Sequence, residues 1–204
     1  MAKTKSSTPI TDLKNQARVL SRHLPLSPRL TSLIFWTPWG WMGVTESEEG
    51  IAAIVLPQTS KSAVAAVLGS EVTDSECSSS SSRLREARKQ LLEYLAGTRT
   101  SFDLPLDLSR GTAFQQRVWK KLGAIPYGQL WSYRGLASRV GGVQYARAVG
   151  GAVGANPLPI VLPCHRIVAQ NATLGGFSCG LPAKRRLLAL EGSLSRLRAA
   201  DRDR

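Results

Sequence analysis

The pattern of apolar and polar residues changes near the middle of the chain. In the first half, residues 33–36, 41–44 and 51–56 form short apolar runs of the length and composition typical of strands. Residues 37–40 (Thr-Pro-Trp-Gly) and 48–50 (Glu-Glu-Gly) separate them with turn-forming side chains. This spacing predicts a meander of three neighbouring strands.

Two helices are predicted after these strands. Residues 61–69 carry apolar side chains at helical spacing and end at Gly69, which suits a helix C-cap. Residues 84–95 place leucine and alanine on one face and charged side chains on the other. Residues 102–108 are short, extended and proline-containing, so we expect them to link two domains.

The second half has the pattern of short helices. Thr112 is suited to cap a first helix, and Ser132 to cap a second over residues 133–140. A third is expected from about residue 144 to 153. Two short helices around a glycine-containing turn, with basic residues on the second, are typical of a helix-turn-helix, although many other helical pairs share the pattern.

The last part of the chain carries two further elements. Residues 160–162 form an apolar run that predicts a buried strand leading into residues 163–166 (Pro-Cys-His-Arg). Residues 175–176 (Gly-Gly) predict a tight turn, and residues 182–190 a final helix. The expected fold class is therefore α/β (α+β) in two domains.

Charge points to the kind of partner. The 204 residues carry 27 lysines and arginines against 14 acidic side chains, a formal charge of +13. Residues 111–204 hold 14 of the basic side chains and 3 of the acidic ones. A domain this basic favours a polyanion such as nucleic acid, although a basic surface alone can also simply keep a protein in solution.

Composition excludes several classes of protein. Apolar residues make up 43%, which is enough for a packed core, and no apolar run approaches the ~18 residues of a membrane span. The amino terminus lacks the apolar stretch of a secretory signal. Three cysteines without framework spacing and two histidines do not make a disulfide scaffold or the usual zinc site. We therefore expect no metal, no membrane contact and a reducing compartment.

Cys164 is the first candidate for chemistry. It stands beside a histidine and an arginine, whose positive charge would lower the pKa of a thiol, and Pro159 and Pro163 fix the backbone around it. A lone cysteine after a strand is otherwise often a small core residue. His165 cannot act side by side with Cys164 on an extended backbone, so proton removal would need a bridging water or a sharp turn. Glu191 could orient His165 or pair with a neighbouring arginine.

Several short motifs occur together in the second half. They lie at residues 111–119 (Gly-Thr-Ala-Phe-Gln-Gln-Arg-Val-Trp), 125–128 (Ile-Pro-Tyr-Gly), 132–133 (Ser-Tyr), 146–150 (Ala-Arg-Ala-Val-Gly), 156–157 (Asn-Pro), 163–166 (Pro-Cys-His-Arg), 175–176 (Gly-Gly) and 191–192 (Glu-Gly). Over about residues 110–192 this combination resembles the O6-alkylguanine-DNA alkyltransferases. The turn at residues 37–40 and Gly50 fit the ribonuclease H-like amino-terminal domain of that family.

The resemblance implies a domain plan and a function. The plan is a ribonuclease H-like domain (29–108), a mainly helical helix-turn-helix domain with the active-site cysteine (109–192) and a basic tail (193–204). Before them, the mixed polar composition of residues 1–28 predicts a flexible tail, with one short helical possibility at residues 13–20. The implied function is direct-reversal DNA repair by a single-turnover methylated-DNA–[protein]-cysteine S-methyltransferase. It acts as a monomer without cofactors on double-stranded DNA with alkylated guanine, or O4-alkylthymine, bound through the minor groove. It would be cytoplasmic and nucleoid-associated, or nuclear in a eukaryote.

The resemblance also implies roles for individual residues. Cys164 is the nucleophile, His165 takes its proton through a water, Glu191 holds His165, and Asn156 braces the turn before the thiol. The substrate-binding positions are Tyr133, Pro159, Ile167, Phe177, Ser178 and Lys184. The DNA-binding positions are Arg147, which replaces the flipped base in the stack, and Tyr133, Arg134, Gln144 and Gln170.

Some positions depart from the family pattern, and other functions compete. Phe177 stands where many relatives have tyrosine, Cys179 where they have glycine, and Tyr145 where a small residue is usual.

The alternative functions are a non-catalytic sensor of alkylation damage, a helix-turn-helix regulator with an inert Cys164, and a thiol hydrolase. Without the resemblance, a phosphate contact would be the better interpretation of Arg147. A redox disulfide between Cys164 and Cys179 is a further hypothesis.

Overall fold

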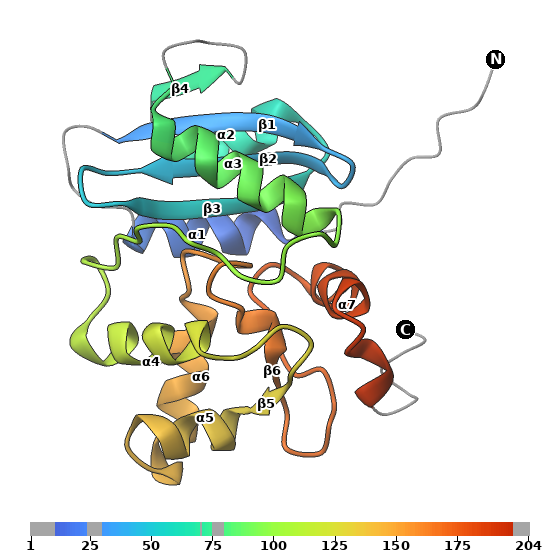
Figure 1. The fold of residues 1–204 in the computed structure, drawn as a ribbon. Helices are drawn as coiled ribbons and strands as arrows, with labels where there is room; N and C mark the ends of the chain where they lie inside the picture. Colours follow the sequence, from blue (N-terminus) through green and yellow to red (C-terminus); the bar gives the residue numbers. More distant parts are fainter. Residues whose placement is uncertain (1–10, 24–29, 70, 75–79, 198–204) are drawn as a thin grey trace.

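The computed structural model describes residues 11–23, 30–69, 71–74 and 80–197 (Figure 1). Its first domain is built on one four-stranded sheet, in the order β3-β2-β1-β4. The strands are β1 (Thr31–Thr37), β2 (Gly40–Glu46), β3 (Ile51–Gln58) and β4 (Glu71–Asp74). The first three are antiparallel neighbours, which confirms the predicted meander, and β4, which was not predicted, runs parallel to β1.

Helices cover both faces of this sheet. Alternate residues of the strands point to opposite faces, so Phe35 packs with helix α3 (Ser82–Leu95) and Ile34 with helix α2 (Lys61–Leu68). Both helices were predicted. Gly69 caps α2 with φ of +59°, a backbone conformation that glycine adopts without strain.

Helix α1 (Leu13–His23) corrects the expectation of a flexible tail over residues 1–28. Its Leu20 is buried in the same cluster as Ile34 and α2. The helix includes the short helical possibility at residues 13–20, and Leu20 and His23, which recur at helical spacing, give it a face to bury. Residues 1–10 and 24–28 of that expected tail lie outside the described residues.

The second domain contains short helices around its own core. They are α4 (Ala113–Gly123), α5 (Tyr133–Val140), α6 (Ala146–Gly154) and α7 (Leu181–Leu190), with two-residue strands β5 (Trp131–Ser132) and β6 (Ile167–Val168) paired in parallel. The buried Trp119 donates from Nε1 to the carbonyl of Ala152 at 2.8 Å, which fixes α4 against α6. No helix within the described residues is long and apolar enough to cross a bilayer.

The strand predicted at residues 160–162 is wrong. These residues form a buried turn in which Leu162 N–H donates to the carbonyl of Leu158 at 2.9 Å, and Ile160 has φ of +76°. Pro159 and Pro163 flank the run and lack the N–H groups that pairing in a sheet requires. The apolar character of the segment reflects burial and not strand formation.

The basic tail expected over residues 193–204 also needs correction in its first part. Residues 194–196 form a 3₁₀ turn, and Leu197 is buried against Leu188 and Val168. Residues 198–204 lie outside the described part of the chain.

The two domains meet along β3. Ile51 forms a bridge with Leu106 of the linking segment, and Ile54 N–H donates to the carbonyl of Pro157 at 3.0 Å. The linker is therefore extended, as predicted, and the sheet reaches the loop that precedes Cys164. This contact positions the first domain against the site described below.

A prediction about stability follows from the start of α4. The Thr112 hydroxyl accepts from Gln115 N–H at 3.2 Å, and the Gln115 side chain accepts from Thr112 N–H at 2.9 Å, a complete capping box. Thr112→Ala should lower the free energy of unfolding by about 1 kcal/mol in urea titration. Thr112→Ser, which keeps the acceptor, is the control. An unchanged midpoint in the alanine variant would contradict the role of the cap.

Candidate active site around Cys164

Cys164 lies at the start of a 3₁₀ turn, Cys164–Arg166, and is only 2% exposed. The Asn156 side chain donates from Nδ2 to Sγ of Cys164 at 3.0 Å and to the carbonyl of Leu162 at 2.7 Å. Its Oδ1 accepts from Leu158 N–H at 3.0 Å. One amide thus braces the buried turn and contacts the thiol at the end of it.

The Cys164 thiol is neutral at rest. Burial raises its pKa from 9.0 to about 11, although the hydrogen bond from Asn156 and the charge of Lys184 act in the opposite direction. The expectation of a net lowering of this pKa is wrong, because desolvation of the thiolate outweighs the effect of the neighbouring positive charge. A nucleophilic thiolate therefore has to be generated by a base.

His165 and Glu191 form a fully buried pair beside the thiol. His165 Nε2 and Glu191 Oε1 are 2.9 Å apart, and neither side chain is exposed. Burial lowers the pKa of His165 despite the Glu191 carboxylate, so the imidazole is neutral and Nε2 is the nitrogen that donates to Glu191. Nδ1 then carries the free lone pair, and it has no hydrogen-bond partner among the described residues.

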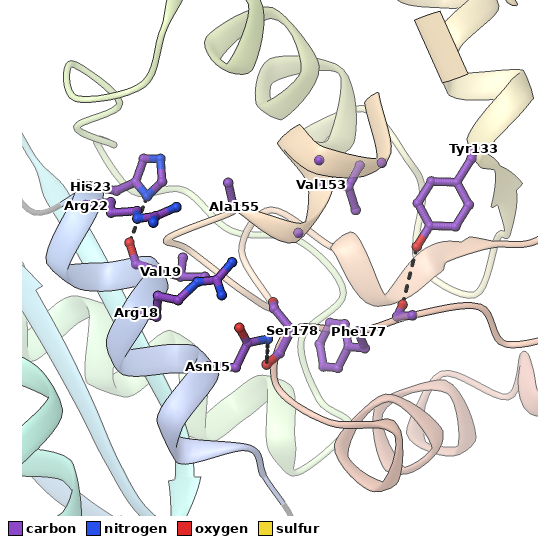
Figure 2. Close-up of a pocket in the computed structure, with 14 residues that line it drawn as sticks. Asn15, Arg18, Val19, Arg22, His23, Tyr133, Val153, Ala155, Phe177 and Ser178 are labelled. Atoms are coloured by element: carbon purple, nitrogen blue, oxygen red, sulfur yellow. Dashed lines mark hydrogen bonds between the residues drawn. The ribbon is translucent and has the colours of Figure 1, made fainter. Parts of the chain in front are cut away.

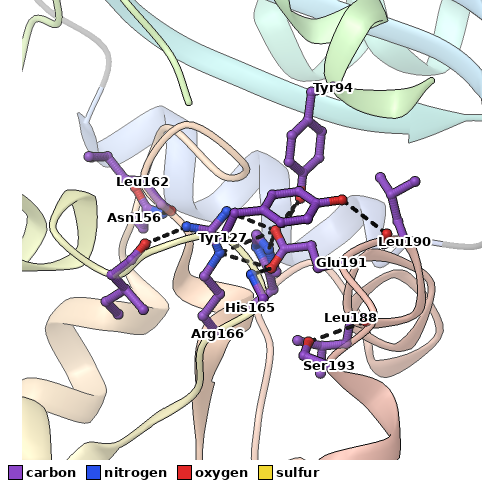
Figure 3. A network of polar contacts seen from close by, with 12 residues as sticks. Tyr94, Tyr127, Asn156, Leu162, His165, Arg166, Leu188, Leu190, Glu191 and Ser193 are labelled. Atoms are coloured by element: carbon purple, nitrogen blue, oxygen red, sulfur yellow. Dashed lines mark hydrogen bonds and ion pairs between the residues drawn. The ribbon is translucent and has the colours of Figure 1, made fainter. Parts of the chain in front are cut away.

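Glu191, which follows the last residue of α7, is the centre of a wider network (Figure 3). Arg166 donates from Nη2 to Oε1 at 2.8 Å and from Nε to Oε2 at 2.9 Å. Tyr94 OH donates to Oε1 at 2.6 Å, and Gly128 N–H to Oε2 at 3.2 Å. Burial alone would raise the pKa of Glu191, but the hydrogen bonds from His165 and Arg166 outweigh it and hold that pKa well below its usual range.

Both interpretations of Glu191 left open by the sequence are thus realised in the structure. The same carboxylate contacts His165 and pairs with Arg166. Arg166 does not contact the thiol; its Nη1 donates to the carbonyl of Ile125. The backbone from Cys164 to Arg166 is a 3₁₀ turn and not extended, which corrects the geometric premise used for His165.

A cleft of about 410 Å³ lies between α1 and α6 (Figure 2), and Cys164, His165 and Glu191 are not among the residues that line it. Tyr133, Phe177 and Ser178 line it, as do glycines 150, 151 and 154 of α6. Tyr133 OH donates to the carbonyl of Gly176 at 3.3 Å. Burial raises the pKa of Tyr133, and so would negative charge on Cys164, which couples the thiol electrostatically to a side chain of the cleft.

Three of the predicted substrate-binding positions, Pro159, Ile167 and Lys184, do not line the cleft. Lys184 donates from Nζ to the carbonyls of Ile167 at 2.6 Å, Gly176 at 3.2 Å and Leu174. Burial lowers its pKa to about 8, although Cys164 opposes this. Lys184 therefore holds the loop that carries Gly176. Ile167 is fully buried, and Pro159 lines a small separate cavity with Ser178 and Cys179.

The predicted DNA-binding side chains other than Tyr133 are exposed on the second domain. They are Arg134 on α5, Arg147 on α6, Gln144 in the 3₁₀ turn before α6, and Gln170 in the loop after β6. Cys179 is buried, and burial raises its pKa, so it is not an exposed and easily oxidised thiol.

Two groups of residues escaped the sequence analysis. Tyr94 lies on the buried face of α3 and reaches Glu191 from the first domain; a buried tyrosine hydroxyl requires a partner, and that was the available signal. Asn15, Arg18 and Arg22 of α1 line the cleft opposite Tyr133.

Within the described residues, no group of three or more His, Cys, Asp or Glu side chains is placed to hold a metal.

Comparison with known proteins bears directly on this site. The family described as "6-O-methylguanine DNA methyltransferase, DNA binding domain" matches residues 113–193. The family described as "6-O-methylguanine DNA methyltransferase, ribonuclease-like domain" matches residues 34–108. Together the two matches cover most of the chain and both of its domains.

Individual relatives agree with these matches. The chain is 52% identical over 104 residues to the methylated-DNA–protein-cysteine methyltransferase of Mycobacterium tuberculosis, a match that spans 51% of this chain and 62% of that protein. It is 40% identical over 142 residues to the constitutive enzyme of Bacillus subtilis, spanning 70% and 82% of the two chains. A crystal structure of Mycobacterium tuberculosis OGT in complex with DNA aligns with a TM-score of 0.64 and 37% identity, covering 83% of this chain and 96% of that one.

These findings confirm the two-domain architecture and the resemblance recognised in the motifs around Cys164. The chain belongs to the O6-alkylguanine-DNA alkyltransferase family.

Proposed function

We propose that this protein repairs alkylated DNA directly, by transferring the alkyl group from O6 of guanine to Sγ of Cys164. The observation that carries the proposal is the arrangement at the thiol: a neutral Cys164 next to a neutral, fully buried His165 whose Nδ1 is unpartnered among the described residues. Family membership and the methyltransferase names of the relatives support it. The protein is thus a methylated-DNA–[protein]-cysteine S-methyltransferase.

The reaction needs one proton transfer and one substitution. The Cys164 thiol loses its proton through a bridging water to Nδ1 of His165, and the sulfur attacks the alkyl carbon in line with the bond to O6. The S–C bond forms as the C–O6 bond breaks, and the guanine anion takes up a proton. A thioether has no leaving group that water can displace, so the protein acts once.

Glu191 makes the proton transfer favourable. It fixes the tautomer that leaves Nδ1 free, and its negative charge stabilises the imidazolium that forms on proton uptake. Arg166 keeps the carboxylate ionised and fixes its orientation. The network therefore supplies a base that is neutral at rest and tolerates a positive charge during transfer.

DNA binding has to deliver the lesion to the cleft. A base inside a duplex is out of reach, so the nucleotide is flipped out at a cost of a few kcal/mol. Helix α6 enters the minor groove, and the glycines at positions 150, 151 and 154 permit close approach; at 151 and 154 an added Cβ would meet nothing within 4 Å. Arg147 takes the place of the flipped base in the stack, and Tyr133 contacts the flipped base. The DNA backbone is contacted by Arg134, Gln144 and Gln170.

The protein acts as a monomer on double-stranded DNA, in the cytoplasm with the nucleoid. The phosphate backbone supplies most of the affinity, in keeping with the charge of the second half. A non-catalytic damage sensor would not need a cysteine placed beside a buried His–Glu pair, and this favours transfer over sensing.

The first prediction concerns stoichiometry. Incubation with a duplex that contains O6-methylguanine should add one methyl mass per chain, and peptide mapping should locate it on Cys164. Cys164→Ala should gain no mass. Continued product formation with excess substrate and unmodified protein would overturn the single-turnover mechanism.

The second prediction concerns the resting thiol. In a Cys77→Ser, Cys179→Ser background, alkylation of Cys164 by iodoacetamide should accelerate tenfold per pH unit until the pH reaches about 11. Asn156→Ala should move this midpoint upward, because the Asn156 hydrogen bond stabilises the thiolate. A midpoint at or below 9.0 would mean that the resting thiol is already activated.

The third prediction separates flipping from chemistry. Arg147→Ala should slow repair of duplex DNA by roughly ten- to hundredfold, which corresponds to about 1–3 kcal/mol of support for the flipped state. Transfer from free O6-methylguanine base, measured in parallel, needs no flipping and should change little. Equal losses on both substrates would show that Arg147 does not replace the flipped base.

A further inference from the structure

Helix α1 is a part of the cleft that the family matches do not include. The matched segments are residues 34–108 and 113–193, whereas α1 spans Leu13–His23. Nevertheless Asn15, Arg18, Val19, Arg22 and His23 all line the cleft that contains Tyr133. One wall of the substrate cleft is therefore contributed by an element outside the matched domains.

This helix is firmly held against the first domain and α4. Leu20 is buried between the sheet and α2, and Gln16 accepts from Leu56 N–H at 3.0 Å through Oε1. The His23 ring packs edge-on against Trp119, with ring centroids 5.4 Å apart. These contacts fix both the position of α1 and its rotation about its own axis.

Its first turn is bonded to the loop that forms the floor of the cleft. Asn15 donates from Nδ2 to the carbonyl of Ser178 at 2.9 Å, and Asp12 N–H donates to the carbonyl of Cys179 at 2.9 Å. Helix and loop therefore form a continuous wall. Because α1 is fixed in its rotation about its own axis, one stripe of its surface faces the cleft.

That stripe is basic. Asn15, Arg18, Val19 and Arg22 recur at helical spacing on one face, and Figure 2 shows the two arginine side chains extending into the cleft. Both arginines are exposed, and neither forms an ion pair with a carboxylate in the described parts of the chain. Two uncompensated guanidinium groups in one cleft favour an anionic ligand.

The opposite wall is the proposed DNA-binding face of α6. Gly150, Gly151 and Gly154 line the cleft, and they lie three, four and seven residues after Arg147, so they share its side of the helix. A helix in the minor groove has a sugar–phosphate strand on either side of it, so DNA bound on this face would bring one strand toward the cleft. The arginines of α1 stand on the far side of that path.

We propose that α1 is a second DNA-binding element, in which Arg18 and Arg22 bind phosphate groups of the strand that carries the flipped nucleotide. The inference rests on the proposed function, because it takes the occupant of the cleft to be DNA. The ligand is the phosphodiester backbone, so these contacts are independent of base sequence and hold the strand while the lesion is turned into the cleft.

The test compares salt dependence of binding to a duplex that contains O6-methylguanine. An Arg18→Ala, Arg22→Ala double variant should lower the slope of log affinity against log salt by about 1.8, since each phosphate contact contributes about 0.9. The gap in affinity between wild type and variant should therefore shrink about tenfold between 50 and 200 mM salt. Arg18→Lys, Arg22→Lys, which keeps both charges, should retain most of the slope.

Lys14→Ala is the matched control. Lys14 is exposed on the same helix but does not line the cleft, so its loss should leave the slope unchanged. Urea unfolding of each variant checks that α1 still packs. A wild-type slope in the folded double alanine variant would overturn the proposal, as would an equal loss in Lys14→Ala, which would indicate a diffuse field and no specific contact. Failure of the proposed function is distinguished by mass measurement, because wild-type protein would then accept no methyl group.

Discussion

The buried carboxylate of Glu191 is the interaction on which the second domain depends. An ionised group out of contact with water is stable only when its neighbours replace the lost hydration, and here Arg166, His165, Tyr94 and the backbone of Gly128 do so. Removing one partner of such a pair commonly costs 3–5 kcal/mol. The groups that, in the proposed mechanism, prepare His165 for proton uptake are therefore the same groups that hold the loops together.

The environment of Cys164 follows from this constraint. Burial keeps the thiol protonated, so it reacts slowly with oxidants and electrophiles until a base removes its proton. The turn over residues 160–162 and the side chain of Asn156 fix the sulfur without charging it. Lys184 also fixes the surrounding loops without charging the sulfur, because its ammonium group donates hydrogen bonds to their backbone carbonyls. In the proposed mechanism, the sulfur becomes negatively charged only when His165 takes its proton.

Local signals in the sequence were sufficient for most of the fold. The caps at Thr112, Ser132 and Gly69 predicted where helices begin and end, because each satisfies backbone groups that a helix end leaves open. The run at residues 160–162 was misread because burial and strand formation give the same apolar pattern. Pro159 and Pro163, on either side of this run, were the signal that it does not pair in a sheet.

Contacts between distant segments could not be predicted in the same way. Motif positions such as Cys164, His165 and Glu191 lie together as expected, and their placement came from the family resemblance as well as from residue chemistry. The roles of Tyr94 and α1 were missed because nothing local indicates which distant segment a side chain will meet. The pKa of Cys164 was misjudged for a related reason, since desolvation depends on the whole fold.

Tyr94 has a consequence for how the two domains can be inherited. It belongs to α3 of the first domain, yet its hydroxyl completes the shell of Glu191 in the second. A recombination event that joined this second domain to an unrelated partner just before residue 111 would keep every motif of the second half and still leave the carboxylate one donor short. The boundary that divides the chain into domains therefore does not divide its chemistry, and the two halves must be exchanged as one unit.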